Sequence, residues 1–386
     1  MSSTRAQNVD PKNWVLEHTT TAPSKASIVA IGGDGVGKEV VDAAIRCLQA
    51  LDLPLEIESP VHGLLAEQAG LDPFSAELRS SMESCDAVLF GAVDTGPNGR
   101  CRPILRHLRF GLQCYANVRP AFNVEGIPCK LGDGNTNLVV VRELSEGMYP
   151  GCEGSLEELA TRWPELRDRI GKELPRDGVF ALRVTTEGAS RRIGRYAAKL
   201  SKQRRDNGIG DGCVTIVGKD NVLKQSGGLF HQSIEEEVVA EGLETRYLHV
   251  DDAAHKLVAK SEMFDVVVTT NLFGDILSDI AAEAFGGMGL APSAGIGEGV
   301  AYFEPCHGSA PDIAGQGVAN PAAAILSAAQ MLAYLGFGAG GHRLTEALFR
   351  TIRNGSHTAD LGGTLSTTAF TDDVLRTLEN TAKKKS

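Results

Sequence analysis

The sequence predicts an α/β fold with two domains, and three observations carry this prediction. Short apolar runs typical of strands alternate along the chain with runs of helical periodicity. The length of 386 residues exceeds that of most single domains. Hydrophobic residues make up 42% and charged residues 23%, which are globular values and argue against disorder, collagen-like repeats or a coiled coil. The runs predicted as strands are residues 27–31, 87–91, 138–141, 214–217 and 266–270.

The first segment of the chain has no predicted regular structure. Residues 1–26 lack the apolar or arginine-rich pattern of a targeting signal, so we expect a flexible leader and a cytoplasmic protein. The eight cysteines show no C-x-x-C spacing and no close histidine, which argues against a zinc site or a disulfide framework. The formal net charge of −11 argues against binding to nucleic acid or to an anionic membrane.

A glycine-rich turn follows the first predicted strand. Residues 32–37 join that strand to an amphipathic helix predicted over residues 39–51, at the place where a Rossmann fold binds a dinucleotide. Glu56 follows about 20 residues later, as the acid of that motif does. No choice of these glycines gives G-x-G-x-x-G with its third glycine inside the helix. The turn alone therefore leaves a Rossmann loop and a plain tight turn open, and favours the tight turn.

Arginines form the first group of side chains that suggests a binding site. The spacing of Arg102, Arg106 and Arg109 predicts three guanidinium groups on one helical face, and Arg119 and Arg142 follow. Clustered guanidinium groups repel one another unless an anion lies between them, which indicates a site for a small anion. A solvated basic helix is the alternative.

Acidic residues form the second group. Asp275 and Asp279 are four residues apart near a predicted helix start, so both carboxylates leave one face and suit Mg²⁺ or Mn²⁺. Helix capping is the alternative, and it explains Asp275 better than Asp279. Asp251 precedes another predicted helix and could add a third oxygen ligand.

A polar loop rich in glycine and proline spans residues 304–315. It can bind a ligand through backbone groups, His307 and Asp312, although by itself it is only a loop. The apolar stretch that follows, residues 321–335, is too short to cross a bilayer and predicts a buried helix, with Asn320 as its N-cap, Pro321 at its first position and Gly336 at its end.

Taken together, these stretches resemble the β-decarboxylating dehydrogenase family, which contains isocitrate, homoisocitrate, 3-isopropylmalate and tartrate/malate dehydrogenases. The resemblance runs in family order from about residue 27 to residue 370. The stretches that carry it are residues 33–39, 117–120, 146–149, 217–221, 271–279 and 307–315.

The resemblance implies a two-domain isopropylmalate dehydrogenase-like fold with mixed sheets, and not a Rossmann fold. Residues 27–114 and 286–386 would form the large, cofactor-binding domain, and residues 115–285 the small domain with the dimer interface. Residues 152–178, which are rich in charge, would be a surface insertion in the small domain. The early glycine turn would then be structural.

The resemblance also assigns roles to residues. Asp275 and Asp279, with Asp251 from the partner subunit, would hold the divalent cation. Lys219, also from the partner, would act as general base while hydride leaves C2, and Tyr149 would protonate C3 after CO₂ is lost. Because both subunits contribute, a homodimer is the expected minimum active unit. The substrate-binding residues would be Arg102, Arg106, Arg109, Arg119, Arg142 and Asn221.

NAD is the expected cofactor. Asp312 stands where NAD-using members hold the ribose hydroxyls, and its carboxylate would repel the 2′-phosphate of NADP. The cofactor-binding residues implied by the resemblance are Glu304, His307, Gly308, Ser309, Ala310, Asp312 and Asn320.

In the family that this sequence resembles, the helix preceding Arg109 distinguishes the distal groups of the substrates, and Arg106 matches the position at which homoisocitrate enzymes carry an arginine. Burying an unpaired guanidinium of Arg102 or Arg106 against a branched alkyl group would cost several kcal/mol, whereas an anionic group would pair with it. Isocitrate or homoisocitrate is therefore favoured. The alternatives are 3-isopropylmalate, tartrate or D-malate, and an acid of a specialised pathway, because residues 142–146 read Arg-Glu-Leu-Ser-Glu where the family more usually has Arg-Glu-Asn-Thr-Glu.

Two hypotheses from other classes also stand. The first is a non-catalytic regulatory subunit of a hetero-oligomeric isocitrate dehydrogenase. Such subunits usually lack the tyrosine, the lysine or a metal aspartate, all of which are present here. The second is an ordinary Rossmann dehydrogenase that does not decarboxylate, whose activity would survive chelation of divalent metal.

Overall fold

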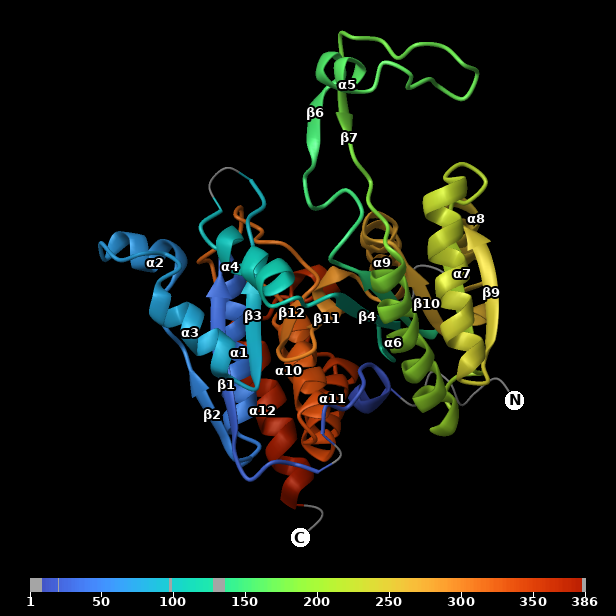
Figure 1. The fold of residues 1–386 in the computed structure, drawn as a ribbon. Coiled ribbons are helices and arrows are strands. Elements are labelled where there is room, and N and C mark those ends of the chain that lie inside the picture. Colours follow the sequence, from blue (N-terminus) through green and yellow to red (C-terminus); the bar gives the residue numbers. More distant parts are fainter. Residues whose placement is uncertain (1–8, 20, 97–98, 128–135, 384–386) are drawn as a thin grey trace.

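A ten-stranded mixed sheet forms the centre of the molecule, and helices cover both of its faces (Figure 1). The computed structural model describes residues 9–383 except residues 20, 97–98 and 128–135. The strand order is β2-β1-β3-β12-β11-β4-β5-β10-β8-β9. The strands are β1 (Ala26–Gly33), β2 (Leu55–Glu58), β3 (Ala87–Ala92), β4 (Ala116–Phe122), β5 (Asn137–Glu143), β8 (Cys213–Gly218), β9 (Glu244–His249), β10 (Val266–Thr269), β11 (Pro292–Ile296) and β12 (Ala301–Pro305).

The antiparallel strands of this mixed sheet lie in its middle. The pairs β12–β11, β11–β4 and β4–β5 are antiparallel, and the other neighbouring strands are parallel. This arrangement confirms the predicted mixed α/β fold and differs from the parallel sheet of a Rossmann domain. The predicted division into two domains would cut the sheet between β11 and β4, with five strands on each side.

Strands buried on both faces explain why the sequence shows continuous apolar runs instead of alternating ones. In β1, Ile28 and Ala30 belong to the main core, while Val29 and Ile31 belong to a second core on the opposite face. The principal helices are α1 (Gly37–Gln49), α2 (Gly63–Gln68), α3 (Ala76–Ser84), α4 (Arg102–Arg106), α6 (Glu187–Asp206), α7 (Lys224–Ala240), α8 (Val250–Ala259), α9 (Asn271–Phe285), α10 (Ala322–Tyr334), α11 (Gly338–Arg353) and α12 (Thr367–Lys383).

Helix α10 is the predicted buried helix, and all its residues are buried. The Asn320 side chain accepts a hydrogen bond from Ala322 N at 2.9 Å, but the N-cap residue is Pro321, so Asn320 lies one residue before its predicted position. Pro321 lies just before the helix, one residue from its predicted place. Gly336 ends the helix with a φ of +84°, a conformation that glycine adopts without a steric penalty.

The expected flexible leader is wrong for the part of residues 1–26 that lies near the core. Trp14 is completely buried and stacks on Phe122 of β4 at a centroid distance of 4.8 Å. The carbonyl of Asn13 accepts a hydrogen bond from the buried Arg204 of α6 at 2.9 Å, and His18 N donates to Tyr334 O of α10. The segment has no periodic pattern. The sequence therefore gave no local signal that its one tryptophan is buried by distant elements.

The charged insertion projects from the body as an arm (Figure 1). The arm contains the strand pair β6 (Glu153–Ser155) and β7 (Val179–Ala181) and the short helix α5 (Leu156–Arg162), so it extends beyond the predicted residues 152–178. Apolar side chains on the arm are exposed, among them Val179 at 82% and Ile170 at 74%. The arm confirms that this part of the chain lies at the surface.

Candidate active site

The candidate site lies where the two halves of the sheet meet. Arg119 is on β4, Arg142 is near the end of β5, and Glu304 is on β12. Asp275 and Asp279 come from α9, which begins just after β10. Each of these side chains therefore stands on, or directly after, a central strand, where the packed core fixes its position.

Asp275 is the centre of the cluster. Its carboxylate forms an ion pair with Arg142, which is 1% exposed, and it accepts a hydrogen bond from the Tyr149 hydroxyl at 2.6 Å. Arg119 lies 3.7 Å from Asp275 and 2.9 Å from Asp279. Asp275 is the fifth residue of α9, and its carboxylate pairs with arginines instead of the amides of the first turn. The helix-capping alternative is therefore not supported.

The electrostatics keep this cluster charged at neutral pH. Burial raises the pKa of Asp275, but Arg142, the Tyr149 hydrogen bond and Arg119 outweigh that effect and hold the pKa below its usual range. Burial, together with the positive charge of Arg119, lowers the pKa of Arg142 to about 10. Asp279 has a raised pKa because burial dominates over its pairing with Arg119. A carboxylate such as Asp279 offers hard oxygen atoms that suit a divalent cation.

Of the three arginines predicted on one helical face, only Arg109 joins the cluster. Helix α4 ends at Arg106, and the chain continues as a π-helical turn over His107–Gly111, which changes the direction in which later side chains point. Arg109 is half-buried, donates from Nε to Tyr302 at 3.1 Å and lies 3.5 Å from Glu304. Arg102 and Arg106 are exposed. The prediction of a single arginine face is wrong because it assumed uninterrupted α-helical spacing.

The lysine and the third aspartate stand apart from the cluster within one chain. Lys219 follows β8 and forms an ion pair with Asp251 at the start of α8, and Asp251 is 70% exposed. Asn221 lies in the exposed turn after β8. Within the part of the chain that the structure describes, no three His, Cys, Asp or Glu side chains are close enough together to hold a metal ion. One chain therefore supplies only two of the three predicted metal ligands in one place.

The predicted cofactor loop has features of a ligand-binding surface. His307 Nε2 is buried without a hydrogen-bond partner, and burial lowers the pKa of this histidine, so its ring is neutral. Asn320 donates to Asp360 at 2.9 Å, which places a carboxylate beside the loop. Asp312 is exposed. A side chain built on Gly308 would meet no other atoms within 4 Å, so the backbone there is open to a ligand.

Glu304 is the exception among the residues predicted to bind cofactor. Its carboxylate is buried against Arg109 in the arginine cluster, and burial raises its pKa. The sequence pattern placed Glu304 beside the loop because only two residues separate it from His307. Its strand, β12, turns the side chain toward the arginines instead.

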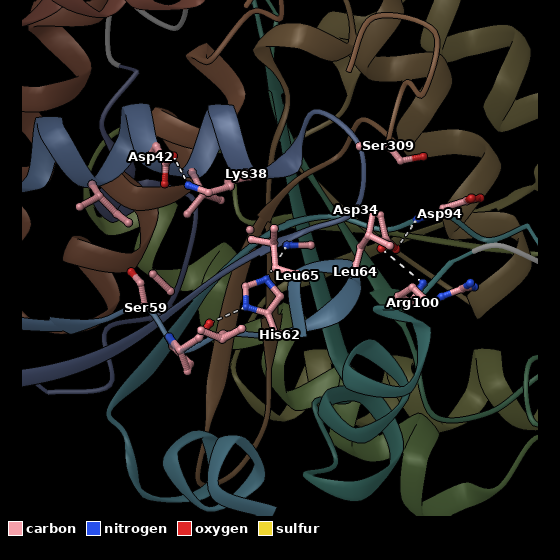
Figure 2. A pocket seen from close by; sticks show the side chains of 18 of the residues that line it. Asp34, Lys38, Asp42, Ser59, His62, Leu64, Leu65, Asp94, Arg100 and Ser309 are labelled. Carbon is pink, nitrogen blue, oxygen red and sulfur yellow. Dashed lines mark hydrogen bonds and ion pairs between the residues drawn. The ribbon is translucent and has the colours of Figure 1, made fainter. Parts of the chain in front are cut away.

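The glycine turn of residues 32–37 contacts the loop that is predicted to bind the cofactor. Val36 N donates to Ser309 O at 2.9 Å, and a Cβ on Gly35 would lie 1.9 Å from the same oxygen, so a larger residue would push the loop away. A cavity of about 540 Å³ lies beside the turn (Figure 2). Lys38, His62 and Ser309 are among its lining residues, whereas the arginine cluster is not. The turn thus holds the loop in place, which agrees with the structural role that the resemblance implies for it.

Several residues that shape the site were not predicted. Asn271 accepts from Arg142 Nε at 3.0 Å and from Nη2 at 2.8 Å, and it donates to the carbonyls of Leu144 and Glu146. Ser278 accepts from Arg119 at 2.8 Å. Both residues share a helical face with Asp275 and Asp279, and the spacing of polar residues along residues 271–279 could have indicated this.

An arginine cluster that suits a small anion, beside two carboxylates that suit a hard cation, is typical of the class of enzyme sites for small anionic substrates. Comparison with known proteins agrees with this class. The isocitrate/isopropylmalate dehydrogenase family model matches residues 27–374. The chain is 41% identical over 358 residues to 3-isopropylmalate dehydrogenase of Archaeoglobus fulgidus, covering 91% of this chain and 99% of the relative.

Two further relatives point to the same family. An isocitrate/homoisocitrate dehydrogenase of Thermus thermophilus is 41% identical over 360 residues, covering 92% of this chain and 98% of the relative. The crystal structure of isocitrate dehydrogenase from Methylococcus capsulatus matches with a TM-score of 0.79 and 34% identity, covering 92% of this chain and 99% of that chain. The chain therefore belongs to the isocitrate/isopropylmalate dehydrogenase family, whose members are decarboxylating dehydrogenases that act on a CH–OH group.

The helices of the structure bear on the prediction that the apolar stretch of residues 321–335 does not cross a membrane. Among the residues that the structure describes, no helix combines the length and the apolar character needed to cross a bilayer. The apolar stretch around α10 is instead packed inside the core.

Proposed function

We propose that the protein catalyses the metal-dependent oxidative decarboxylation of a malate-type 2-hydroxy acid, with NAD as the hydride acceptor. The observation that carries the proposal is the cluster in which Arg109, Arg119 and Arg142 surround Asp275, with Asp279 and Tyr149 beside it. Membership of a family of decarboxylating dehydrogenases supports this assignment.

The charges of the cluster fit such a substrate. The three guanidinium groups are balanced by the carboxylates of Asp275, Asp279 and Glu304, which all interact with one or more of the arginines. A bound divalent cation would add two positive charges, and the two carboxylates of a malate-type core would neutralise them. The cluster would therefore be neutral with neither or with both of them bound, and charged with only one, which favours binding of cation and substrate together.

The donor chemistry of the aspartates fits Mg²⁺ or Mn²⁺. Asp275 and Asp279 offer hard oxygen atoms from one helix face, and Asp251 of the partner subunit would complete the set. When bound, the cation lowers the pKa of the substrate hydroxyl and stabilises the negative charge that develops as CO₂ leaves.

The side chains of this chain have distinct proposed roles. Arg109, Arg119 and Arg142 bind the carboxylates and hold C2 in place for hydride transfer. Tyr149 donates the proton to C3, because the residue is 36% exposed at the edge of the cluster and its pKa is raised by burial, which keeps the phenol protonated at neutral pH. Lys219 of the partner subunit accepts the proton of the C2 hydroxyl.

A homodimer with shared active sites completes this proposal. Lys219 and Asp251 pair with each other on the surface of one chain, away from the residues that they would serve. The exposed apolar side chains of the arm and of α7, such as Val179, Ile170 and Val239, offer a surface that a second copy would cover. This arrangement would explain why the described residues of one chain bring together only two of the three proposed metal ligands.

The preferences for the distal group of the substrate and for NAD over NADP are inferred from two exposed side chains. Among the described residues, no carboxylate pairs with Arg106, so its charge is available to an anionic distal group, which favours isocitrate or homoisocitrate. Asp312 is exposed on the cofactor loop and favours NAD over NADP. Relatives named for isopropylmalate are slightly more similar to this chain than those named for isocitrate/homoisocitrate, although both groups reach 41% identity, so the distal group is decided by measurement.

The test is NADH formation with Mg²⁺ on isocitrate, homoisocitrate, 3-isopropylmalate, tartrate and D-malate, repeated with EDTA and with NADP. Turnover of a tricarboxylate that EDTA abolishes, and that Arg106→Ala weakens selectively, is the expected result. Faster turnover of 3-isopropylmalate than of both tricarboxylates would overturn the assignment of the distal group. Activity that persists in EDTA, or no turnover of any of the five acids, would overturn the proposed reaction.

A further inference from the structure

Tyr302 is a buried polar residue that the proposed reaction does not use. It lies in the middle of β12, is completely buried, and belongs to the apolar core on the face of the sheet that also holds Leu108 and Cys114. Its hydroxyl accepts a hydrogen bond from Arg109 Nε at 3.1 Å. A phenol in such surroundings needs a partner for its oxygen, and here that partner is a charged side chain of the arginine cluster.

The neighbouring strand makes space for the Tyr302 ring. Gly295 on β11 is the antiparallel partner of Tyr302. A Cβ at Gly295 would lie 2.0 Å from Cε1 and 2.3 Å from Cζ of the ring, closer than atoms can approach. The ring therefore covers the Cα of Gly295, an aromatic–glycine pair across two strands. Two residues, Gly295 and Tyr302, are therefore required to place this one hydroxyl group.

The hydrogen bond between Tyr302 and Arg109 affects how Arg109 pairs with its other neighbour. The second neighbour of Arg109 is Glu304, whose Oε1 lies 3.5 Å from Nη2. Without Tyr302, the carboxylate of Glu304 could take both Nε and Nη2 in a bidentate pair, the arrangement that arginine and carboxylate groups favour. Such a pair would turn the guanidinium toward Glu304 and cancel its charge. The neutral phenol occupies Nε, so it fixes the orientation of Arg109 without neutralising it.

We propose that Tyr302 is a positioning residue for substrate binding, which holds Arg109 so that its remaining N–H groups meet a carboxylate of the hydroxy acid, and that Gly295 is present to admit the Tyr302 ring. The inference rests on the proposed function only in assigning Arg109 to the substrate. It adds a residue on β12 that determines how well that arginine works.

The experiment compares the steady-state kinetics of the dimeric enzyme carrying Tyr302→Phe with those of the wild type. The variant keeps the ring and removes the hydroxyl. We expect KM for the hydroxy acid to rise about tenfold, because a charged donor loses its acceptor, while KM for NAD and kcat change less than about threefold. Tyr334→Phe is the matched control, because Tyr334 is a buried phenol that packs on Phe303 at 5.5 Å, and KM should not change.

If Tyr302→Phe does not fold, a second pair of variants tests the same proposal. Gly295→Ala should displace the ring and raise KM for the hydroxy acid. The double variant Gly295→Ala/Tyr302→Leu should regain the thermal stability of the wild type and keep the raised KM, because packing is restored but the hydrogen bond is not.

The outcomes separate this inference from the proposed function. If the wild type shows metal-dependent turnover and Tyr302→Phe, or the stable double variant, keeps KM for the hydroxy acid within twofold, the positioning role is wrong. It is equally wrong if kcat and both KM values change together, which is the sign of a general structural defect. If the wild type turns over none of the acids, or does so in EDTA, the proposed function itself fails.

Discussion

Replacing Asn271 by alanine would remove the side chain that connects Arg142 to the start of α9. Its amide oxygen accepts from Arg142 Nε and Nη2, and its amide nitrogen donates to Leu144 O at 2.9 Å and to Glu146 O at 3.1 Å. Asn271 is 1% exposed. The substitution would leave two guanidinium N–H groups and two carbonyls without this partner in a buried region.

The magnitude follows from these four contacts. Hydrogen bonds to a charged group contribute about 1.5–3 kcal/mol each and neutral ones about 0.5–1.5 kcal/mol each, and water that enters the space recovers a part. We therefore expect the free energy of unfolding to fall by about 3–5 kcal/mol. With an unfolding entropy of roughly 2.1 cal/mol/K per residue, a chain of 386 residues would lose about 4–6 °C in Tm.

The kinetic consequence is specific to the substrate. Arg142 keeps its ion pair with Asp275 but loses the contact that orients its Nε edge, so KM for the hydroxy acid should rise at least about tenfold while KM for NAD changes little. The assays are thermal unfolding followed by circular dichroism, and steady-state NADH formation. Gln232→Ala is the control, because this exposed helical amide makes one local hydrogen bond and should shift stability by less than about 0.5 kcal/mol. An unchanged Tm together with an unchanged KM would refute the reasoning.

Three further predictions concern the leader, a surface histidine and the proton donor. Trp14→Ala should cost about 3–5 kcal/mol in a chemical denaturation experiment, because the indole is fully buried against Phe122, and a loss below about 1 kcal/mol would show that the leader is not part of the core. The hydrogen bond of Asp10 raises the pKa of His342 above 6.5, so the stabilisation by this pair is complete below that pH and is lost as the pH rises through the folded-state pKa. The Tm of the wild type should thus exceed that of His342→Gln at pH 6 and equal it at pH 8.5, and a gap that widens with pH would contradict this sign. Tyr149→Phe should lower kcat by about 10²–10⁴-fold with little change in KM for NAD, as measured by NADH formation, and near-normal kcat would remove Tyr149 from the role of proton donor.

The sequence predicted much of the fold because strand and helix patterns are local. Each of the apolar runs appears as a strand, and the buried helix is found within one residue of its predicted start. Asp275 and Asp279 share a helix face as their spacing requires. These predictions succeeded because backbone geometry alone relates residues that are two, four or seven positions apart.

Other features could not be predicted because they depend on residues that are far apart in the chain. Trp14 is buried against β4, although it lies 108 positions from Phe122 in the chain, so a segment without periodicity gave no local signal. The π-helical turn at His107–Gly111 changes the direction of Arg109, and propensities do not reveal that one turn departs from α-helical spacing. The contact between Arg109 and Tyr302 joins residues 193 positions apart.

The sequence by itself determined the class of fold, the buried helix and the residue types of the site, because these follow from local periodicity and from short stretches that resemble a known family. Only the tertiary structure decided which arginines meet the aspartates, that Glu304 faces Arg109, and that Lys219 and Asp251 stand apart within one chain. The physical reason is that a site made from β4, β5, β12 and α9 depends on how strands pair across a sheet, and pairing between distant strands is set by packing that no local pattern records.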